Sequence, residues 1–206
     1  GVLGEVLEVH SDFYTALPGG GFRGESSHVL LEDMAVHTFD TARVICGANA
    51  DSVLARDWNP PGSWFRGGAS AVADFRMING IVYTYRGCWV TIGCHTSWQG
   101  SWRILCSEGC ATWDGEGEIK AEKLDRVEDG WRHFKPVPIP ECQPNSHEGH
   151  AACLDDFVKA IRSGANPRTW CEDNFHTLAM SLAAVRSCEN SGEIAVPQPN
   201  PAEEIP

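Results

Sequence analysis

Short β-strand-like segments dominate the middle of this chain, and they restrict its fold more than any other feature. Each alternates apolar and polar residues or is rich in β-branched and aromatic residues, and the connections between them are short. The segments cover residues 52–58, 69–77, 81–90, 101–106, 110–114, 118–124 and 131–136. Asn79-Gly80 is typical of a two-residue hairpin turn, which joins antiparallel neighbours. The sequence therefore predicts an open, largely antiparallel sheet.

Helical patterns flank these segments. Alternation over residues 2–9 predicts a first strand, and the glycine run at 19–21 predicts a flexible loop or plain linker. A helix is expected from near Glu32 to Cys46, and two more over 150–163 and 172–190. In the last helix an apolar stripe is expected, formed by Phe175, Leu178, Leu182 and Val185.

The predicted fold class is α+β, an open and predominantly antiparallel β-sheet with helices packed on one face. The 206 residues, 42% of them apolar, suffice for one domain. We expect that domain over residues 1–196 and an extended, proline-rich tail over 197–206.

Charge and hydropathy limit the partners of the chain. The formal net charge of -12, with lysines and arginines scattered singly, argues against nucleic acid and anionic membranes. An apolar run of bilayer length and a signal sequence are both missing from these residues, so the expected location is cytoplasmic. Gly1 looks like a position inside a longer polypeptide, and a targeting signal upstream of it would not be visible.

The cysteines do not form a recognisable framework. Nine is an odd number, and no C-x-x-C pair occurs among Cys88, Cys94, Cys106 and Cys110. We therefore expect free thiols and no metal site. A metal site built from Cys94, His95 and another cysteine is a weaker alternative.

Candidate acid-base residues lie in the run from Glu32 to Asp40. Asp33 and His37 stand at i and i+4 of the predicted helix, with Asp40 one turn further on, so the three share a face. Histidine suits proton transfer because its ordinary pKa of about 6.5 lies near working pH, and a carboxylate can fix its tautomer. The alternative is that Asp33 is a helix N-terminal charge and His37 an ordinary boundary residue.

A series of motifs resembles, in order and spacing, the C-terminal domain of the glucose-fructose oxidoreductase / inositol dehydrogenase / rhizopine catabolism (Gfo/Idh/MocA) family. The resemblance rests on residues 1–9, 32–40, 96–104, 109–115 and 172–180. Ala35 departs from the usual glycine, and 25–28 replaces a glycine run. The family's G-x-G-x-x-G and E-K-P lysine have no counterpart, because both belong to an N-terminal dinucleotide-binding domain that these residues do not contain.

The resemblance implies the substrate-binding and oligomerisation domain of an NAD(P)-dependent oxidoreductase that acts on a sugar or polyol. His37 would exchange the hydroxyl proton, and Asp33 would orient it or bind an adjacent hydroxyl. NAD or NADP would be bound mainly by the upstream domain, so we expect no cofactor-binding residue here and no activity from this chain alone. A dimer or tetramer assembled through the sheet is also implied.

Substrate-contacting candidates lie in two further places. Trp98 occupies the position of an aromatic substrate contact in the resembling family, with His95 and Gln99 beside it as polar partners for a polyol; core or interface packing is the alternative. Asp40 joins them from the first helix.

Asn174 and His176, at the start of the last helix, are the remaining candidates, and helix capping is the alternative for both. Two other functions stay open for the chain as a whole. One is a non-catalytic carbohydrate-binding or scaffolding module, and the other, weaker one is a metal-binding protein.

Overall fold

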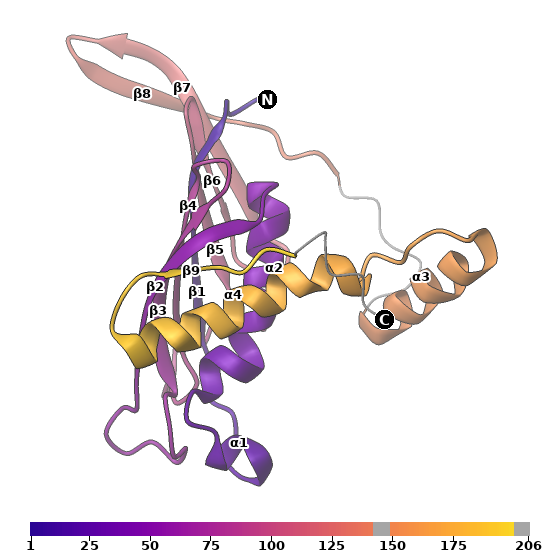
Figure 1. The fold of residues 1–206 in the computed structure, drawn as a ribbon. Helices are drawn as coiled ribbons and strands as arrows, with labels where there is room; N and C mark the ends of the chain where they lie inside the picture. Colours follow the sequence, from indigo (N-terminus) through magenta and orange to yellow (C-terminus); the bar gives the residue numbers. More distant parts are fainter. Residues whose placement is uncertain (142–148, 200–206) are drawn as a thin grey trace.

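The computed structural model describes residues 1–141 and 149–199. These form a nine-stranded sheet in the order β8-β7-β6-β5-β1-β4-β3-β2-β9, with α2 and α4 on one of its faces (Figure 1). The strands are β1 Val6–Tyr14, β2 Ala50–Trp58, β3 Ser70–Met77, β4 Val82–Cys88, β5 Ser101–Cys106, β6 Gly109–Trp113, β7 Ile119–Glu128, β8 Trp131–Pro136 and β9 Ile194–Ala195. Among the strand pairs of the described residues, only β1–β4 is parallel. The predicted α+β class and open, mostly antiparallel sheet are confirmed.

The helical elements are α1 Gly21–Glu25, the π-helix η1 Leu30–Met34, α2 Ala35–Cys46, α3 Gly149–Ser163 and α4 Cys171–Asn190. The prediction of one α-helix from near Glu32 was wrong at its start, because the first turn is η1 and α2 begins only at Ala35. A π-turn is wider than an α-turn, which changes the direction of side chains across the junction. None of the described helices has the length and apolarity needed to cross a bilayer.

The first strand differs from its predicted bounds of 2–9. It runs to Tyr14, because Val9, Ser11 and Phe13 continue the inward-facing alternation and are buried. The glycine run then leads into α1 rather than remaining a loop throughout.

The core lies between the sheet and α2. Phe39 is fully buried, and its ring packs edge-on against Phe75, Tyr83 and Tyr85, with centroids 4.8, 6.2 and 5.3 Å away. The Tyr83 hydroxyl lies 2.8 Å from Ser11 Oγ, so this phenol is satisfied inside the core. Aromatic packing from β3 and β4 therefore fixes the position of α2.

The apolar stripe expected on α4 was wrong for three of its four residues. Phe175, Leu178 and Leu182 are exposed, and only Val185 is buried. Mostly small side chains are buried on this helix instead, together with Met180, and Ser187 Oγ accepts a 2.8 Å hydrogen bond from the Ala55 amide of β2. Helix and strand approach too closely for large residues at that contact.

The helix α3 exists as predicted but stands away from the sheet (Figure 1). Ala160 is the one buried residue of α3 in the described structure. The large apolar side chains of α3 are exposed; they are Leu154, Phe157, Val158 and Ile161. Together with α4, this leaves a broad apolar surface that the described residues do not cover.

Candidate functional site

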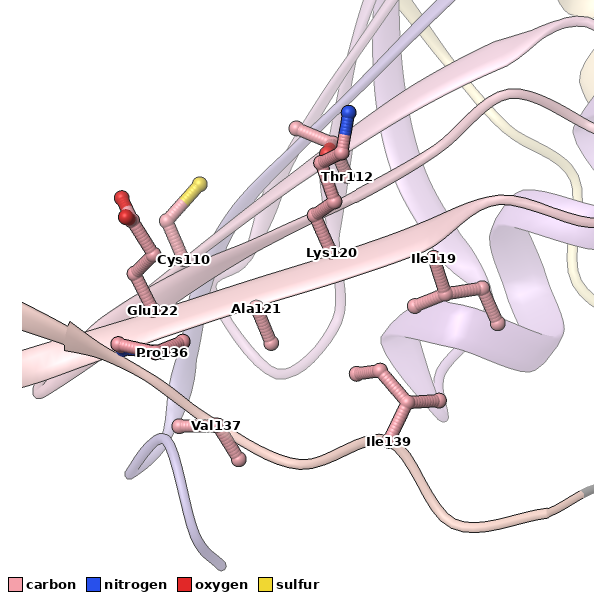
Figure 2. Close-up of a pocket in the computed structure, with 9 residues that line it drawn as sticks. All are labelled: Cys110, Thr112, Ile119, Lys120, Ala121, Glu122, Pro136, Val137 and Ile139. Atoms are coloured by element: carbon pink, nitrogen blue, oxygen red, sulfur yellow. The ribbon is translucent and has the colours of Figure 1, made fainter.

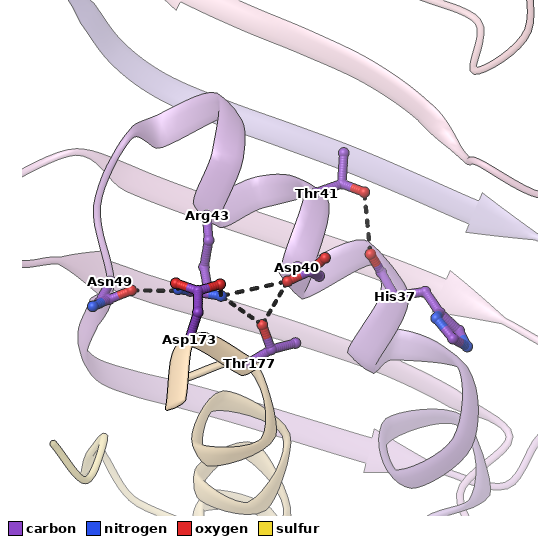
Figure 3. A network of polar contacts seen from close by, with 7 residues as sticks. All are labelled: His37, Asp40, Thr41, Arg43, Asn49, Asp173 and Thr177. Atoms are coloured by element: carbon purple, nitrogen blue, oxygen red, sulfur yellow. Dashed lines mark hydrogen bonds and ion pairs between the residues drawn. The ribbon is translucent and has the colours of Figure 1, made fainter. Parts of the chain in front are cut away.

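The side chain of His37 projects from α2 on the side away from the core. His37 and Val44 are exposed, whereas Phe39 and Ala42 of the same helix are fully buried against the sheet. In the described part of the chain the imidazole has no hydrogen bond or ion pair; only the main-chain oxygen of His37 is used, accepting a bond from Thr41 Oγ1 (3.1 Å, Figure 3). Both ring nitrogens are therefore free to meet a ligand from outside this domain.

Asp33 lies in η1, four residues before His37, but its carboxylate bonds to another partner. Arg23 of α1 donates from Nε to Asp33 Oδ2 at 2.6 Å. The sequence analysis did not identify Arg23, since nothing in the glycine-rich segment indicates that it folds back onto η1. The geometry thus places a guanidinium beside Asp33, four residues before His37.

Asp40 belongs to a network that joins α2 to α4 (Figure 3). Its Oδ1 accepts hydrogen bonds from Thr177 Oγ1 at 2.7 Å and from Arg43 Nη1 at 3.4 Å. Arg43, with a side chain 9% exposed, also donates to both Asp173 oxygens and to Asn49 Oδ1. Asp40 is therefore engaged in holding two helices together, and His37 points away from this network.

Replacing Arg43 with alanine is expected to lower the free energy of unfolding by roughly 2 kcal/mol, because hydrogen bonds to charged groups are lost and polar partners stay behind. Denaturant unfolding measures this change. Arg126→Ala is the matched control, since Arg126 forms exposed ion pairs on β7. Equal losses in the two variants would contradict a special role for the network.

The two candidates in the first turns of α4 have different environments. Asn174 is partly buried, and its side chain makes no hydrogen bond within the described chain. His176 Nδ1 is buried without a partner among the described residues. Burial and then the positive charge of Arg43 lower the pKa of His176 from its ordinary value of 6.5. Neither side chain caps the helix, whose N-cap Trp170 makes no side-chain cap bond.

The lowered pKa of His176 predicts a pH dependence of stability. As pH falls from about 6.5 toward the lower folded-state value, the unfolded chain binds more protons than the folded one, so the free energy of unfolding decreases. His176→Gln is expected to flatten that decrease, measured by urea unfolding between about pH 7.5 and 5. An unchanged slope would contradict the prediction, and the half-exposed His133 supplies the control variant His133→Gln.

Trp98, His95 and Gln99 share the loop between β4 and β5. Trp98 is 56% exposed, and its ring centroid lies 6.1 Å from that of buried Phe13. His95 is exposed, with Nε2 2.8 Å from the Thr91 carbonyl oxygen, and the exposed Gln99 side chain has no hydrogen-bond partner in the described chain. No hydrogen bond joins these three to His37 within the ranges that the structure describes.

This loop and the segment that leads to η1 nevertheless lie at the same end of the sheet. The parallel strands β1 and β4 both end there. Thr91 N donates to Thr15 O at 3.1 Å, and Leu17 N donates to Trp89 O at 3.3 Å. The candidates thus form three groups: one on η1 and α2, one on the loop after β4, and one in the first turns of α4. The first two lie on connected segments.

Cys94 and His95 do not gather further metal ligands. Across residues 1–141 and 149–199, no cluster of three or more His, Cys, Asp or Glu side chains has an arrangement suited to a metal ion. A hollow of about 480 Å³ lies elsewhere, between β6, β7 and the chain that follows β8 (Figure 2). Its lining includes Thr112, Lys120 and Val137, and none of the candidate residues.

Comparison with known proteins gives a family match. Residues 1–112 match the sequence model of the GFO/IDH/MocA C-terminal domain. The chain is also similar to an uncharacterized protein, y4oX, from Sinorhizobium fredii (strain NBRC 101917 / NGR234), with 25% identity over 170 residues that make up 82% of this chain and 47% of the relative.

Solved structures share the fold. A levoglucosan dehydrogenase in complex with NADH and L-sorbose has a TM-score of 0.76 and 19% identity, over 97% of this chain and 60% of that one. An Agrobacterium radiobacter oxidoreductase in complex with NAD+, L-tartaric acid and magnesium has a TM-score of 0.75 and 18% identity, over 95% and 58%. A Caulobacter crescentus aldose-aldose oxidoreductase complexed with glycerol has a TM-score of 0.71 and 17% identity, over 95% of this chain and 57% of that one. The chain spans less than two thirds of the length of each of these relatives.

Proposed function

The chain belongs to the GFO/IDH/MocA family, as its C-terminal domain, and from this premise we propose that it is the substrate-binding part of an NAD(P)-dependent oxidoreductase that acts on a hydroxyl of a sugar or polyol. The observation that carries the proposal is the free, outward-facing imidazole of His37, four residues after Asp33. An acid-base group at that position can serve a reaction that takes place above α2.

His37 takes the proton of the substrate hydroxyl in this proposal, in its neutral form and through either ring nitrogen. Asp33 binds an adjacent hydroxyl, because its carboxylate is turned to Arg23 rather than to the imidazole. The nicotinamide cofactor supplies the hydride acceptor. Trp98, His95, Gln99, Asp40, Asn174 and His176 remain proposed substrate contacts, with Trp98 offering an apolar ring to sugar C–H groups.

A dinucleotide-binding domain is proposed to hold NAD or NADP over the outward side of α2. The uncovered apolar surface of α3 and α4 supports this arrangement, because such a surface marks a contact with another domain or subunit. The position of His37 agrees with this arrangement. Its side chain faces away from the core, so a cofactor can come near it only from outside this domain.

Assembly through the uncovered sheet face is the proposed route to a dimer or tetramer in the cytoplasm. This face carries charged pairs, among them Arg86 and Asp12, which form a bidentate contact at 2.7 and 2.8 Å. Residues of both signs suit a two-fold contact between copies.

A second function, carbohydrate binding without chemistry, is favoured by the exposed ring of Trp98. An assay of the full-length protein separates the two. Reduction of NAD or NADP with a panel of sugars and polyols, followed by absorbance, supports the oxidoreductase. Sugar binding in calorimetry without any reduction, and without nicotinamide binding, would refute it in favour of the binding module.

A further inference from the structure

Arg23 has unused hydrogen-bonding capacity beside Asp33, one of the two proposed acid-base residues. Its Nε is bonded to Asp33, whereas its Nη1 and Nη2 groups have no partner within the described chain. The side chain is 40% exposed, so a ligand in solvent can reach it. By contrast, Arg43 uses Nε and both Nη groups in internal hydrogen bonds.

The Arg23 guanidinium is also held in place. It lies over the Phe22 ring, 4.6 Å from the centroid, and the Asp33 contact fixes its Nε edge. The short helix that carries it is anchored in turn, since Gly24 O accepts a 3.1 Å hydrogen bond from the Arg66 amide. Pre-positioning lowers the ordering cost of binding a ligand.

The free Nη edge matches one kind of ligand group. The planar guanidinium donates two parallel hydrogen bonds to a carboxylate. A phosphate dianion would call for a second cation, and the neighbouring Arg66 is already paired with Glu25 at 3.3 Å. A singly charged carboxylate is therefore the better match for one arginine whose charge is partly offset by Asp33.

We propose that Arg23 is a substrate-binding residue that selects a carboxylate-bearing sugar, a sugar acid, over the corresponding neutral sugar. The inference rests on the proposed function, because it places the substrate beside His37 and Asp33. The substrate carboxylate occupies the Nη edge, and one of its hydroxyls reaches Asp33 and His37. Arg23 thereby sets specificity and takes no part in proton transfer.

The test uses the full-length protein and two matched pairs, glucose with glucuronate and galactose with galacturonate. The acid of a pair is expected to have the higher kcat/KM. Arg23→Gln is expected to raise KM for that acid ~10–100-fold with little change in kcat, as for loss of a charged hydrogen bond, while the neutral sugar changes little. Arg66→Gln on the same surface is the control, and melting temperatures verify folding.

Two results would overturn the proposal. One is a wild-type preference for the neutral sugar, and the other is an equal loss on both members of a pair, which would leave Arg23 as a support for Asp33 only. If no sugar is oxidised, the proposed function fails. Calorimetric titration with glucuronate then still tests whether Arg23 binds a carboxylate. Binding that Arg23→Gln weakens supports the carboxylate site, whereas absent or unchanged binding overturns it.

Discussion

Turnover of the full-length enzyme is expected to fall ~10²–10⁴-fold when His37 is replaced with glutamine, the range that loss of a general acid-base group produces. Glutamine keeps polarity and approximate size but cannot take up a proton at working pH. Because the His37 side chain makes no hydrogen bond or ion pair in the described structure, the replacement removes no internal contact of that kind. The fall should therefore appear in kcat, with cofactor affinity and melting temperature nearly unchanged.

The matched control is His133→Gln, which alters a half-exposed histidine of β8. A pH–rate profile adds a second readout, because loss of a general acid-base group changes the dependence of kcat/KM on pH. Equal turnover in His37→Gln and wild type would remove His37 from the mechanism. Equal losses in the two histidine variants would point to a general effect on folding.

Replacement of Phe39 with alanine is expected to lower the free energy of unfolding by ~3–5 kcal/mol, as for other buried phenylalanines. The ring is fully buried and is enclosed by Phe75, Tyr83 and Tyr85. Its removal deletes these three edge-on contacts and leaves a cavity that Phe75 and Tyr83 cannot fill without disturbing their own stacked contact, with centroids 5.7 Å apart. Urea unfolding followed by tryptophan fluorescence gives the loss directly.

Two further variants define that result. Phe39→Leu retains most of the volume and should cost only about 1–2 kcal/mol. Phe134→Ala, at a ring that is 58% exposed on β8, should change stability little. A small loss for Phe39→Ala would mean that α2 is not anchored through this residue.

Sequence alone predicted what depends on local periodicity. The Asn79-Gly80 turn lies between β3 and β4, and the strand at 131–136 coincides with β8. Local patterns gave wrong predictions where contacts with residues far away in the sequence determine which side chains are buried. The close approach of β2 decides which side of α4 is buried. Mostly small residues are therefore buried there, and Leu178 and Leu182 are exposed.

The candidate site divides in the same way. The exposed position of His37 could be predicted, because the helical repeat places it on the face opposite Phe39. The contacts of Asp33 and Asp40 depend on Arg23 and Thr177, brought near by folding of the loop and of α4. Their roles in binding or catalysis remain predictions.

The position of β1 has a consequence for biosynthesis. Among the strands of this sheet β1 comes first in the chain, but it lies in the interior, with β4 on one side and β5 on the other. Until Val82 leaves the ribosome, β1 has neither partner, a wait on the order of ten seconds at about 5–20 residues per second. Its apolar face must stay shielded during that time, so termination before β4 leaves this strand unpaired and prone to aggregation.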